Sequence, residues 1–154
     1  MKLIFCLEKD KGMLFFGKRH SQDRELRKKL IEMTYGHNLW MSNYSAKQFT
    51  DYSTIVVDDD YINNVEPDDY CFVEDKSYSV EGVTEFVLCH WNRKYPSDKF
   101  FEIDLKKEGF KKVSIGTWIL SIMFIAYLLA SSTATAQATV APTMGLLPIP
   151  MRPI

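Results

Sequence analysis

The sequence lacks the features that identify several large classes of proteins. Its 19 basic and 20 acidic residues leave a formal net charge of -1, so there is no surplus of cations for a general electrostatic grip on nucleic acid. The three cysteines form no CxxC pair, which argues against a disulfide framework or a zinc site and predicts buried thiols. There is no Gly-rich phosphate loop and no GxSxG motif. The first apolar run, Leu3 to Leu7, is too short for a signal peptide, so we expect the front of the chain in the cytoplasm.

Charge is also missing from one end of the chain. All 20 carboxylates and 18 of the 19 basic residues lie within residues 1–112, and the only charge after them is Arg152. This step predicts a globular domain over 1–112 followed by separate segments. Residues 113–130 are an uncharged stretch of 18, close to the roughly 20 apolar residues of a membrane-spanning helix. The lysines before it favour a cytoplasmic domain with the carboxyl terminus outside.

Two alternatives remain open for this end of the chain. Residues 113–130 could be a buried core helix, although the stretch has no polar face. The whole tail could also be foreign to the fold, as a recombined or frame-shifted end would be. Residues 131–154 are rich in Ser, Thr, Ala and Pro, and this composition predicts disorder.

Within residues 1–112, apolar patterns alternate between strands and helices. The continuous run Leu3 to Leu7 is typical of a strand covered on both faces. Leu26, Leu30 and Met33 recur at helical spacing and predict a helix that starts after Ser21. Further strands are predicted at 39–41, 54–57, 70–73 and 84–91, and short helices at 45–49 and 58–64. The alternation predicts an α/β fold, with a single small, mostly parallel sheet and flanking helices.

Acidic residues follow several of the predicted strands. If the strands run parallel, these carboxylates meet at one edge of the sheet, where open α/β sheets place their ligands. Carboxylate oxygens are the ligands that Mg²⁺ prefers, and bound Mg²⁺ can activate water for phosphodiester cleavage. The alternative is that the same residues cap helices and solvate turns. The candidate metal ligands are Glu8, Asp10, Asp58, Asp59 and Glu74.

A basic segment leads into the first predicted helix. Lys18 and Arg19 are candidate phosphate-binding residues, because guanidinium groups and free amides at a helix start both bind anions. His20, Asp23 and Arg24 are the candidate catalytic residues, with the imidazole as acid or base. The alternative is the solvated outer face of an amphipathic helix.

Three further residues are candidates for ligand binding through stacking. Trp91 and Arg93 lie at the end of the longest predicted strand, and Trp40 lies in another strand. Indole and guanidinium faces both stack on bases and rings. The alternative is packing in the core.

Five strings of the sequence carry a resemblance: MKLIFCLEKDKGMLFFGKR, SQDR, LWMSNYSAKQF, CFVED and WNRKYPSDKFFEIDL. Together they resemble a small uncharacterised bacterial family that often bears the label ribonuclease Z, over about residues 1–114. True ribonuclease Z enzymes resemble metallo-β-lactamases and bind zinc through an HxHxDH cluster. Here the histidines, His20, His37 and His90, are widely spaced and cannot supply that set.

Two functional hypotheses follow from the sequence. The first is a non-catalytic cytoplasmic module that binds another protein or a small ligand and is held at the membrane by residues 113–130. The alternative is a ribonuclease-type hydrolase that acts on RNA through the strand-end carboxylates with Mg²⁺, or through the basic cluster at Arg19 to Arg24.

Overall fold

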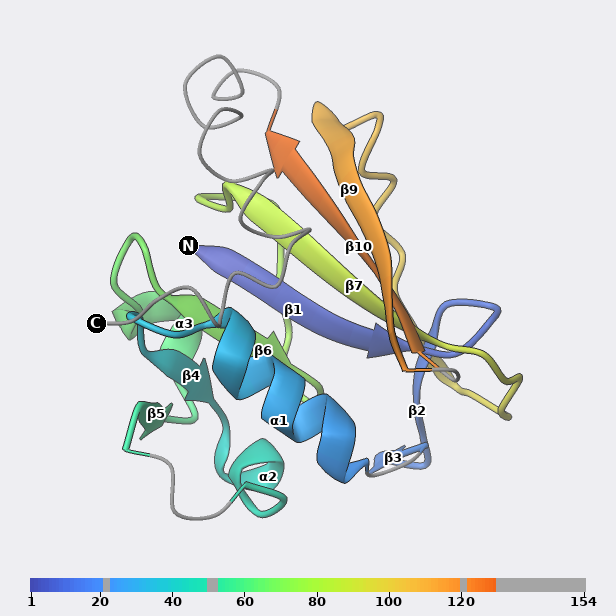
Figure 1. Ribbon diagram of the computed structural model, residues 1–154, viewed down its shortest axis with the longest axis horizontal. Helices are drawn as coiled ribbons and strands as arrows, with labels where there is room; N and C mark the ends of the chain where they lie inside the picture. The colour runs from blue at the N-terminus through green and yellow to red at the C-terminus, as the bar shows by residue number, and fades with distance from the viewer. Residues whose placement is uncertain (21–22, 50–52, 120–121, 130–154) are drawn as a thin grey trace.

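The computed structural model describes residues 1–20, 23–49, 53–119 and 122–129. These residues form a mixed α/β fold with a main sheet of seven strands and a smaller sheet of three (Figure 1). Along the main sheet the strands are β5 (Ile55–Val57), β4 (Leu39–Met41), β6 (Tyr70–Val73), β1 (Lys2–Leu7), β7 (Glu85–Trp91), β10 (Ile122–Leu129) and β9 (Phe110–Ile119). The smaller sheet has the order β3 (Lys18–Arg19), β2 (Gly12–Phe15) and β8 (Lys99–Phe100).

The first five strands of the main sheet run parallel. β1 pairs in parallel with β6 on one side and with β7 on the other, while β4 pairs in parallel with β6 and β5. The side chains of Leu3, Ile4 and Phe5 are completely buried. A central strand of a parallel sheet is covered on both faces, which explains its unbroken apolar run.

Three helices are present among the described residues: α1 (Arg24–Met33), α2 (Asn43–Ala46) and α3 (Tyr61–Asn64). α1 begins where the Asp23 carboxylate accepts hydrogen bonds from the backbone N–H groups of Glu25 and Leu26, a standard N-cap. It buries Leu26 and Leu30, one turn apart, against the main sheet. The predicted start at Ser21 lies outside the described residues.

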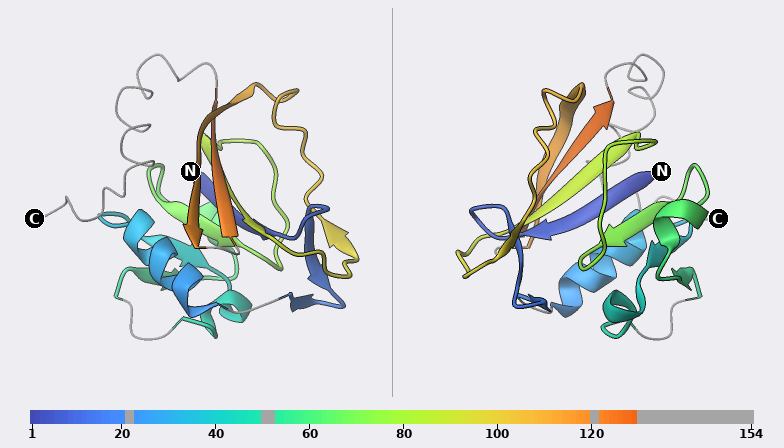
Figure 2. Two further views of the ribbon diagram at one scale, coloured as in Figure 1. Left: turned by 45° about the vertical axis from the view of Figure 1, so that its right-hand side comes forward. Right: turned by 180° about the vertical axis from the view of Figure 1, so that it is seen from behind.

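The two faces of the main sheet carry two separate apolar clusters. One contains Ile4, Val87 and Cys89 with the buried side of α1, and Figure 1 shows α1 across that face. The other contains Leu3 and Phe5 with residues of β2 and of the 101–110 segment. The left view of Figure 2 shows β2 and β8 grouped at one side of the molecule. The small sheet therefore stands beside the carboxyl end of β1.

The hairpin that joins β2 to β3 needs an unusual backbone. Phe15 pairs with Lys18, and the two residues between them, Phe16 and Gly17, have φ angles of 50° and 75°. Positive φ at both positions is typical of a type I′ turn, which suits glycine better than phenylalanine. The carboxylate of Asp98 accepts a hydrogen bond from the Phe16 N–H and helps to hold this turn beside Arg19.

The transmembrane helix predicted over residues 113–130 is wrong. β9 begins at Phe110, so the expected domain boundary after Lys112 falls inside a strand, and β10 pairs antiparallel with both β9 and β7. No helix in the described part of the chain is long and apolar enough to cross a membrane. Residues 131–154, predicted to be disordered, lie outside the described residues.

The error has a physical cause in the position of β10. This strand lies between β7 and β9, and its residues Ile125, Ala126 and Leu128 are buried. A strand in such a position reads as a continuous apolar run, and hydropathy alone does not distinguish it from a helix. The apolar stretch therefore completes the sheet of the domain that it was expected to follow.

Candidate functional site

A small pocket lies at the carboxyl ends of the parallel strands. Its walls include Cys6 from β1, Val73 and Glu74 at the end of β6, and Trp91 from β7. From β1 the chain leads to β4 on one side, and from β7 it leads to β9 and β10 on the other. Open α/β sheets bind ligands where the chain leaves two neighbouring strands toward opposite sides of the sheet. The remaining lining residues are Met13, Arg19, His20, Leu26, Gln48 and Phe72.

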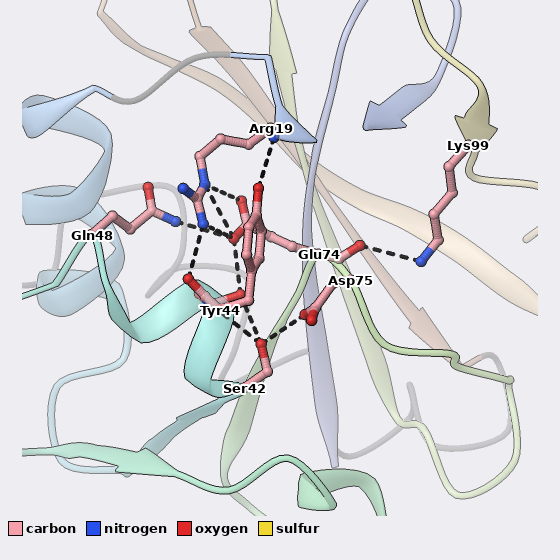
Figure 3. A network of polar contacts seen from close by, with 8 residues as sticks. Arg19, Ser42, Tyr44, Gln48, Glu74, Asp75 and Lys99 are labelled. Carbon is pink, nitrogen blue, oxygen red and sulfur yellow. Dashed lines mark hydrogen bonds and ion pairs between the residues drawn. The ribbon is translucent and has the colours of Figure 1, made fainter. Parts of the chain in front are cut away.

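A buried ion pair occupies the polar side of this pocket (Figure 3). The Arg19 guanidinium donates to both carboxylate oxygens of Glu74, with Nη2 to Oε1 at 2.9 Å and Nε to Oε2 at 3.0 Å. The side chains are only 12% and 8% exposed. Burial alone would lower the pKa of Arg19, but the hydrogen bonds to Glu74 outweigh it and raise that pKa. The two side chains therefore form a close ion pair with little exposure to water.

The segment around α2 holds this ion pair in place. Ser45 Oγ and Gln48 Nε2 both donate to Glu74 Oε1, at 2.9 and 3.2 Å. The Tyr44 ring lies 4.3 Å from the Arg19 guanidinium carbon, and the Tyr44 carbonyl accepts from Arg19 Nη2. Stacking and hydrogen bonding together fix the plane of the guanidinium.

The position of α2 follows from its N-cap. Ser42 Oγ accepts the Ser45 N–H, and the Ser42 hydroxyl donates to Asp75 Oδ1 at 2.7 Å. Figure 3 shows Ser42 and Asp75 next to the Arg19–Glu74 pair. A serine at this position begins a helix readily, so the short segment 42–48 delivers its polar groups to the end of β6.

His20 forms another wall of the pocket. The ring stacks on Tyr95, with 5.1 Å between centroids, and Nε2 lies 3.1 Å from the Pro96 carbonyl oxygen and 2.9 Å from Ser97 Oγ. A carbonyl can only accept, so the contact with Pro96 favours the neutral tautomer with the proton on Nε2 and with Nδ1 as an acceptor. Nδ1 is buried and has no hydrogen-bond partner among the described residues. Burial lowers the pKa of His20, although the Pro96 carbonyl opposes the shift, which favours this neutral form.

Glu8 anchors the loops that carry these walls. Its side chain is 1% exposed, and its carboxylate accepts hydrogen bonds from the backbone N–H groups of Asp10, Gly12 and Tyr95. One carboxylate therefore ties the turn after β1 to the segment that stacks on His20. A methyl group at Gly12 would overlap Ser97 Oγ, so this approach requires glycine.

The predicted metal ligands are not brought together. Glu8 binds backbone amides, Asp10 pairs with Lys94 at 3.1 Å, and Glu74 pairs with Arg19. Asp58 accepts from the Asp60 N–H and from Asn64, while Asp59 accepts from Asn43. In the described ranges, no three His, Cys, Asp or Glu side chains are placed to hold a metal ion. The predicted magnesium site finds no support in this geometry.

The three predicted catalytic residues do not form one cluster. His20 lines the pocket. The Asp23 carboxylate caps α1 instead, where it accepts hydrogen bonds from the backbone N–H groups that were expected to bind an anion. Arg24 is exposed at the first position of α1.

The predicted ligand-binding residues divide in the same way. Arg19 and Trp91 line the pocket, whereas Lys18 and Arg93 are exposed. Trp40 donates from Nε1 to Asp69 Oδ2 at 3.0 Å and packs against the opposite apolar cluster. Trp40 is not among the residues that line the pocket.

Two groups that complete the site, Ser45 and Gln48, were not selected from the sequence. They follow a predicted strand, six and nine residues after Leu39, and the rule that ligands bind at strand ends could have identified them. Cys6 was interpreted only as a buried thiol. Nothing in the sequence indicated that Arg19 would reach Glu74, because that contact joins two sheets.

Comparisons with known proteins bear on the fold. The sequence matches no family model and no curated protein. Among solved structures it is similar to a dihydrofolate reductase from Enterococcus faecalis complexed with NADP(H) and RAB-propyl, with a TM-score of 0.56 and 13% identity, over 82% of this chain and 94% of the other.

These findings correct the sequence-based hypotheses. The resemblance to the family labelled ribonuclease Z is wrong, and the ribonuclease hypothesis is wrong with it, because the structural match is to a dihydrofolate reductase. The membrane-held interaction module is also wrong, because its proposed anchor is two strands of the main sheet. The chain has the fold of the dihydrofolate reductases.

Proposed function

We propose that this chain binds a small planar molecule, rich in N–H donors, in the strand-end pocket. The observation that carries this proposal is the Arg19–Glu74 pair. Glu74 lies at the end of β6 and accepts two hydrogen bonds from the planar Arg19 guanidinium, which also stacks on Tyr44. An amidine or an amino-substituted nitrogen heterocycle presents the same edge of two N–H groups to a carboxylate.

The rest of the pocket suits the same kind of molecule. His20 lines the same pocket as Glu74, and its Nδ1 is an acceptor without a partner among the described residues. Phe72, Trp91 and Leu26 supply apolar walls. Small-molecule sites generally combine apolar walls with a few convergent polar groups. Because both available polar groups accept hydrogen bonds, they select donors on the ligand.

The pocket is too small for the proposed ligand unless one side chain moves out of it. Its free volume is about 10 Å³, room for roughly one water molecule. Arg19 comes from a strand of two residues, whereas Glu74 directly follows a buried strand of the main sheet. We infer that the ligand takes the place of the Arg19 guanidinium and that Arg19 turns outward.

A binding experiment on the full chain tests this proposal. Arg19→Ala removes the resident guanidinium and leaves Glu74 free to accept benzamidine, a planar amidine. We expect benzamidine to raise the Tm of Arg19→Ala more than that of wild type, and the double variant Arg19→Ala/Glu74→Gln to lose the effect. Lys18→Ala, the exposed neighbour, is the matched control and should behave as wild type. Equal shifts for all four proteins would contradict the proposal.

Reduction with NADP(H) is a second candidate function. It is favoured by the structural neighbour, which is named a dihydrofolate reductase and was solved with NADP(H). Glu74 and Asp75 at the end of β6 disfavour phosphate groups close to them, since like charges repel. Quenching of NADPH fluorescence by the chain, followed by NADPH oxidation with dihydrofolate, would establish this activity. No quenching at an excess of protein would exclude it.

A further inference from the structure

Two of the three cysteines are direct neighbours in the main sheet. Cys6 of β1 and Cys89 of β7 are register partners in a parallel pair of strands. Both pack with the cluster on the α1 face of the sheet, so their side chains lie on the same side. The Cys89 thiol is close enough to raise the pKa of Cys6. They are 83 residues apart in the sequence, and the fold alone brings them together.

The backbone geometry of this pair is compatible with a disulfide. Neighbouring strands lie about 4.8 Å apart, and disulfides span Cα separations of about 4.4 to 6.8 Å. Cys71 lacks such a neighbour: its register partners are Leu3 and Trp40, and it belongs to the cluster on the other face. The chain thus contains one thiol pair and one isolated buried thiol.

Access to the pair runs through the pocket. Cys6 lines the pocket and is partly exposed, whereas Cys89 is 1% exposed. The free volume of about 10 Å³ has room for roughly one water molecule, so a small oxidant such as hydrogen peroxide can approach the Cys6 thiol far more easily than glutathione disulfide can. The Cys89 thiol and burial raise the pKa of Cys6, so its thiolate is scarce at neutral pH and its reactions are slow.

We propose that Cys6 and Cys89 form a reversible intramolecular disulfide when hydrogen peroxide enters the strand-end pocket. The Cys6 thiolate attacks one peroxide oxygen, the O–O bond breaks, and Cys6 becomes a sulfenic acid while hydroxide takes a proton and leaves as water. The Cys89 sulfur then attacks the Cys6 sulfur. The S–O bond breaks, the S–S bond forms, and the second oxygen leaves as water with the Cys89 proton. Two thiols are oxidised and one peroxide is reduced to two waters.

This inference does not depend on the proposed ligand. It predicts a modification of the pocket wall whatever the pocket binds. A disulfide would draw the two sulfurs to about 2.05 Å and tie β1 to β7 at the site. Because the bond constrains a long loop of the unfolded chain, it should also raise the Tm by several degrees.

The test uses the wild-type chain, so it requires no variant to fold. The folded protein is treated with hydrogen peroxide, quenched with catalase, unfolded, alkylated with N-ethylmaleimide and mapped without reduction. We expect a cross-link between the peptides of Cys6 and Cys89, with alkylation at Cys71 alone, and faster reaction at higher pH. Dithiothreitol should restore all three alkylatable thiols.

Two variants sharpen this experiment. Cys71→Ser should give the same cross-link, and Cys89→Ser should give none and leave a Cys6 sulfenic acid that dimedone traps. Alkylation of all three cysteines in the treated wild type would overturn the proposal. So would sulfinic acid at Cys6 with Cys89 still alkylated, or a disulfide between two molecules.

Discussion

Two buried carboxylates at opposite ends of the parallel strands differ in their hydrogen-bond partners. Glu74, at the carboxyl end of β6, is 7% exposed and receives Arg19, Ser45 and Gln48. Glu85, at the amino end of β7, is 1% exposed, and its Oε2 has no hydrogen-bond partner among the described residues. Burial raises the pKa of Glu85 to about 7, although the positive charge of Lys2 opposes the rise.

The difference lies in what compensates each carboxylate for the loss of water. A buried charge persists only when partners compensate the loss of water. Glu74 has several donors beside a pocket, and the proposed ligand would exchange with one of them. Among the described residues Glu85 Oε2 has no such donor, and its raised pKa favours the protonated form. The two carboxylates therefore compensate burial in different ways, one by hydrogen bonds to its charge and the other by binding a proton.

The largest expected effect comes from removing the cation at Glu74. Arg19→Ala leaves a buried carboxylate without its main partner, and we expect the free energy of unfolding to fall by about 3 to 5 kcal/mol. Urea denaturation at neutral pH measures the change. Replacing both partners, as Arg19→Met with Glu74→Leu, should recover most of the loss, because no uncompensated charge remains. If the double variant loses as much free energy of unfolding as Arg19→Met and Glu74→Leu lose together as single variants, the two side chains do not interact.

The second effect concerns the pH dependence that Glu85 creates. Folding raises the pKa of Glu85 from 4.5 to about 7, so the folded state holds this proton more tightly than the unfolded chain does. The stabilisation is complete at pH values below the unfolded pKa and is lost as the pH rises through about 7, by up to about 3 kcal/mol. Urea unfolding across this range should show the loss in wild type, and Glu85→Gln should flatten it.

A control separates the two ends of the strands. Glu85→Gln should leave the response of Arg19→Ala to benzamidine unchanged, since Glu85 lies at the opposite end of the sheet from the pocket. In the pH experiment, a free energy of unfolding that depends on pH as steeply in Glu85→Gln as in wild type would assign the pH dependence to another group.

A third buried carboxylate, Glu8, extends the comparison. It is 1% exposed and is satisfied by backbone N–H groups rather than by a cation. Glu8→Gln keeps the shape but replaces one acceptor oxygen with a donor, and a buried donor facing N–H groups costs about 1 to 3 kcal/mol. We expect a loss of about 2 kcal/mol in urea denaturation. Asp10→Asn, an exposed neighbour paired with Lys94, should change stability by less than about 0.5 kcal/mol.

Much of the fold could be predicted from the sequence, because local patterns specified it. The strand at Leu3 to Leu7 and the helix with Leu26 and Leu30 follow from hydrophobic periodicity, and both are present. The C-terminal strands β9 and β10 were missed because an apolar strand inside a sheet and an apolar helix both appear as a continuous apolar run in the sequence. What decides between them is the unpaired edge of β7, a property of the assembled sheet.

The site was predicted only in fragments. Arg19, His20, Glu74 and Trp91 were each selected, but for phosphate binding, catalysis, metal binding and stacking respectively, and the structure joins them in one pocket. Glu74, selected because it follows a predicted strand, lines the pocket. Asp58, selected for the same reason, follows the edge strand β5 and bonds to its own turn. Strand order, which sequence does not reveal, separates these cases.

The smallest expected effect tests how many donors Glu74 requires. Gln48 donates to Glu74 Oε1 at 3.2 Å, and Arg19 and Ser45 remain bound to the same oxygen without it. Gln48→Leu keeps the packing volume and removes one donor, so we expect a loss of about 1 kcal/mol in urea denaturation. Exposed Lys47→Leu is the matched control for the added apolar side chain. A loss as large as that of Arg19→Ala would mean that the whole network, rather than the guanidinium alone, stabilises the buried Glu74 side chain, and that a ligand must preserve the hydrogen bond from Gln48 in order to bind.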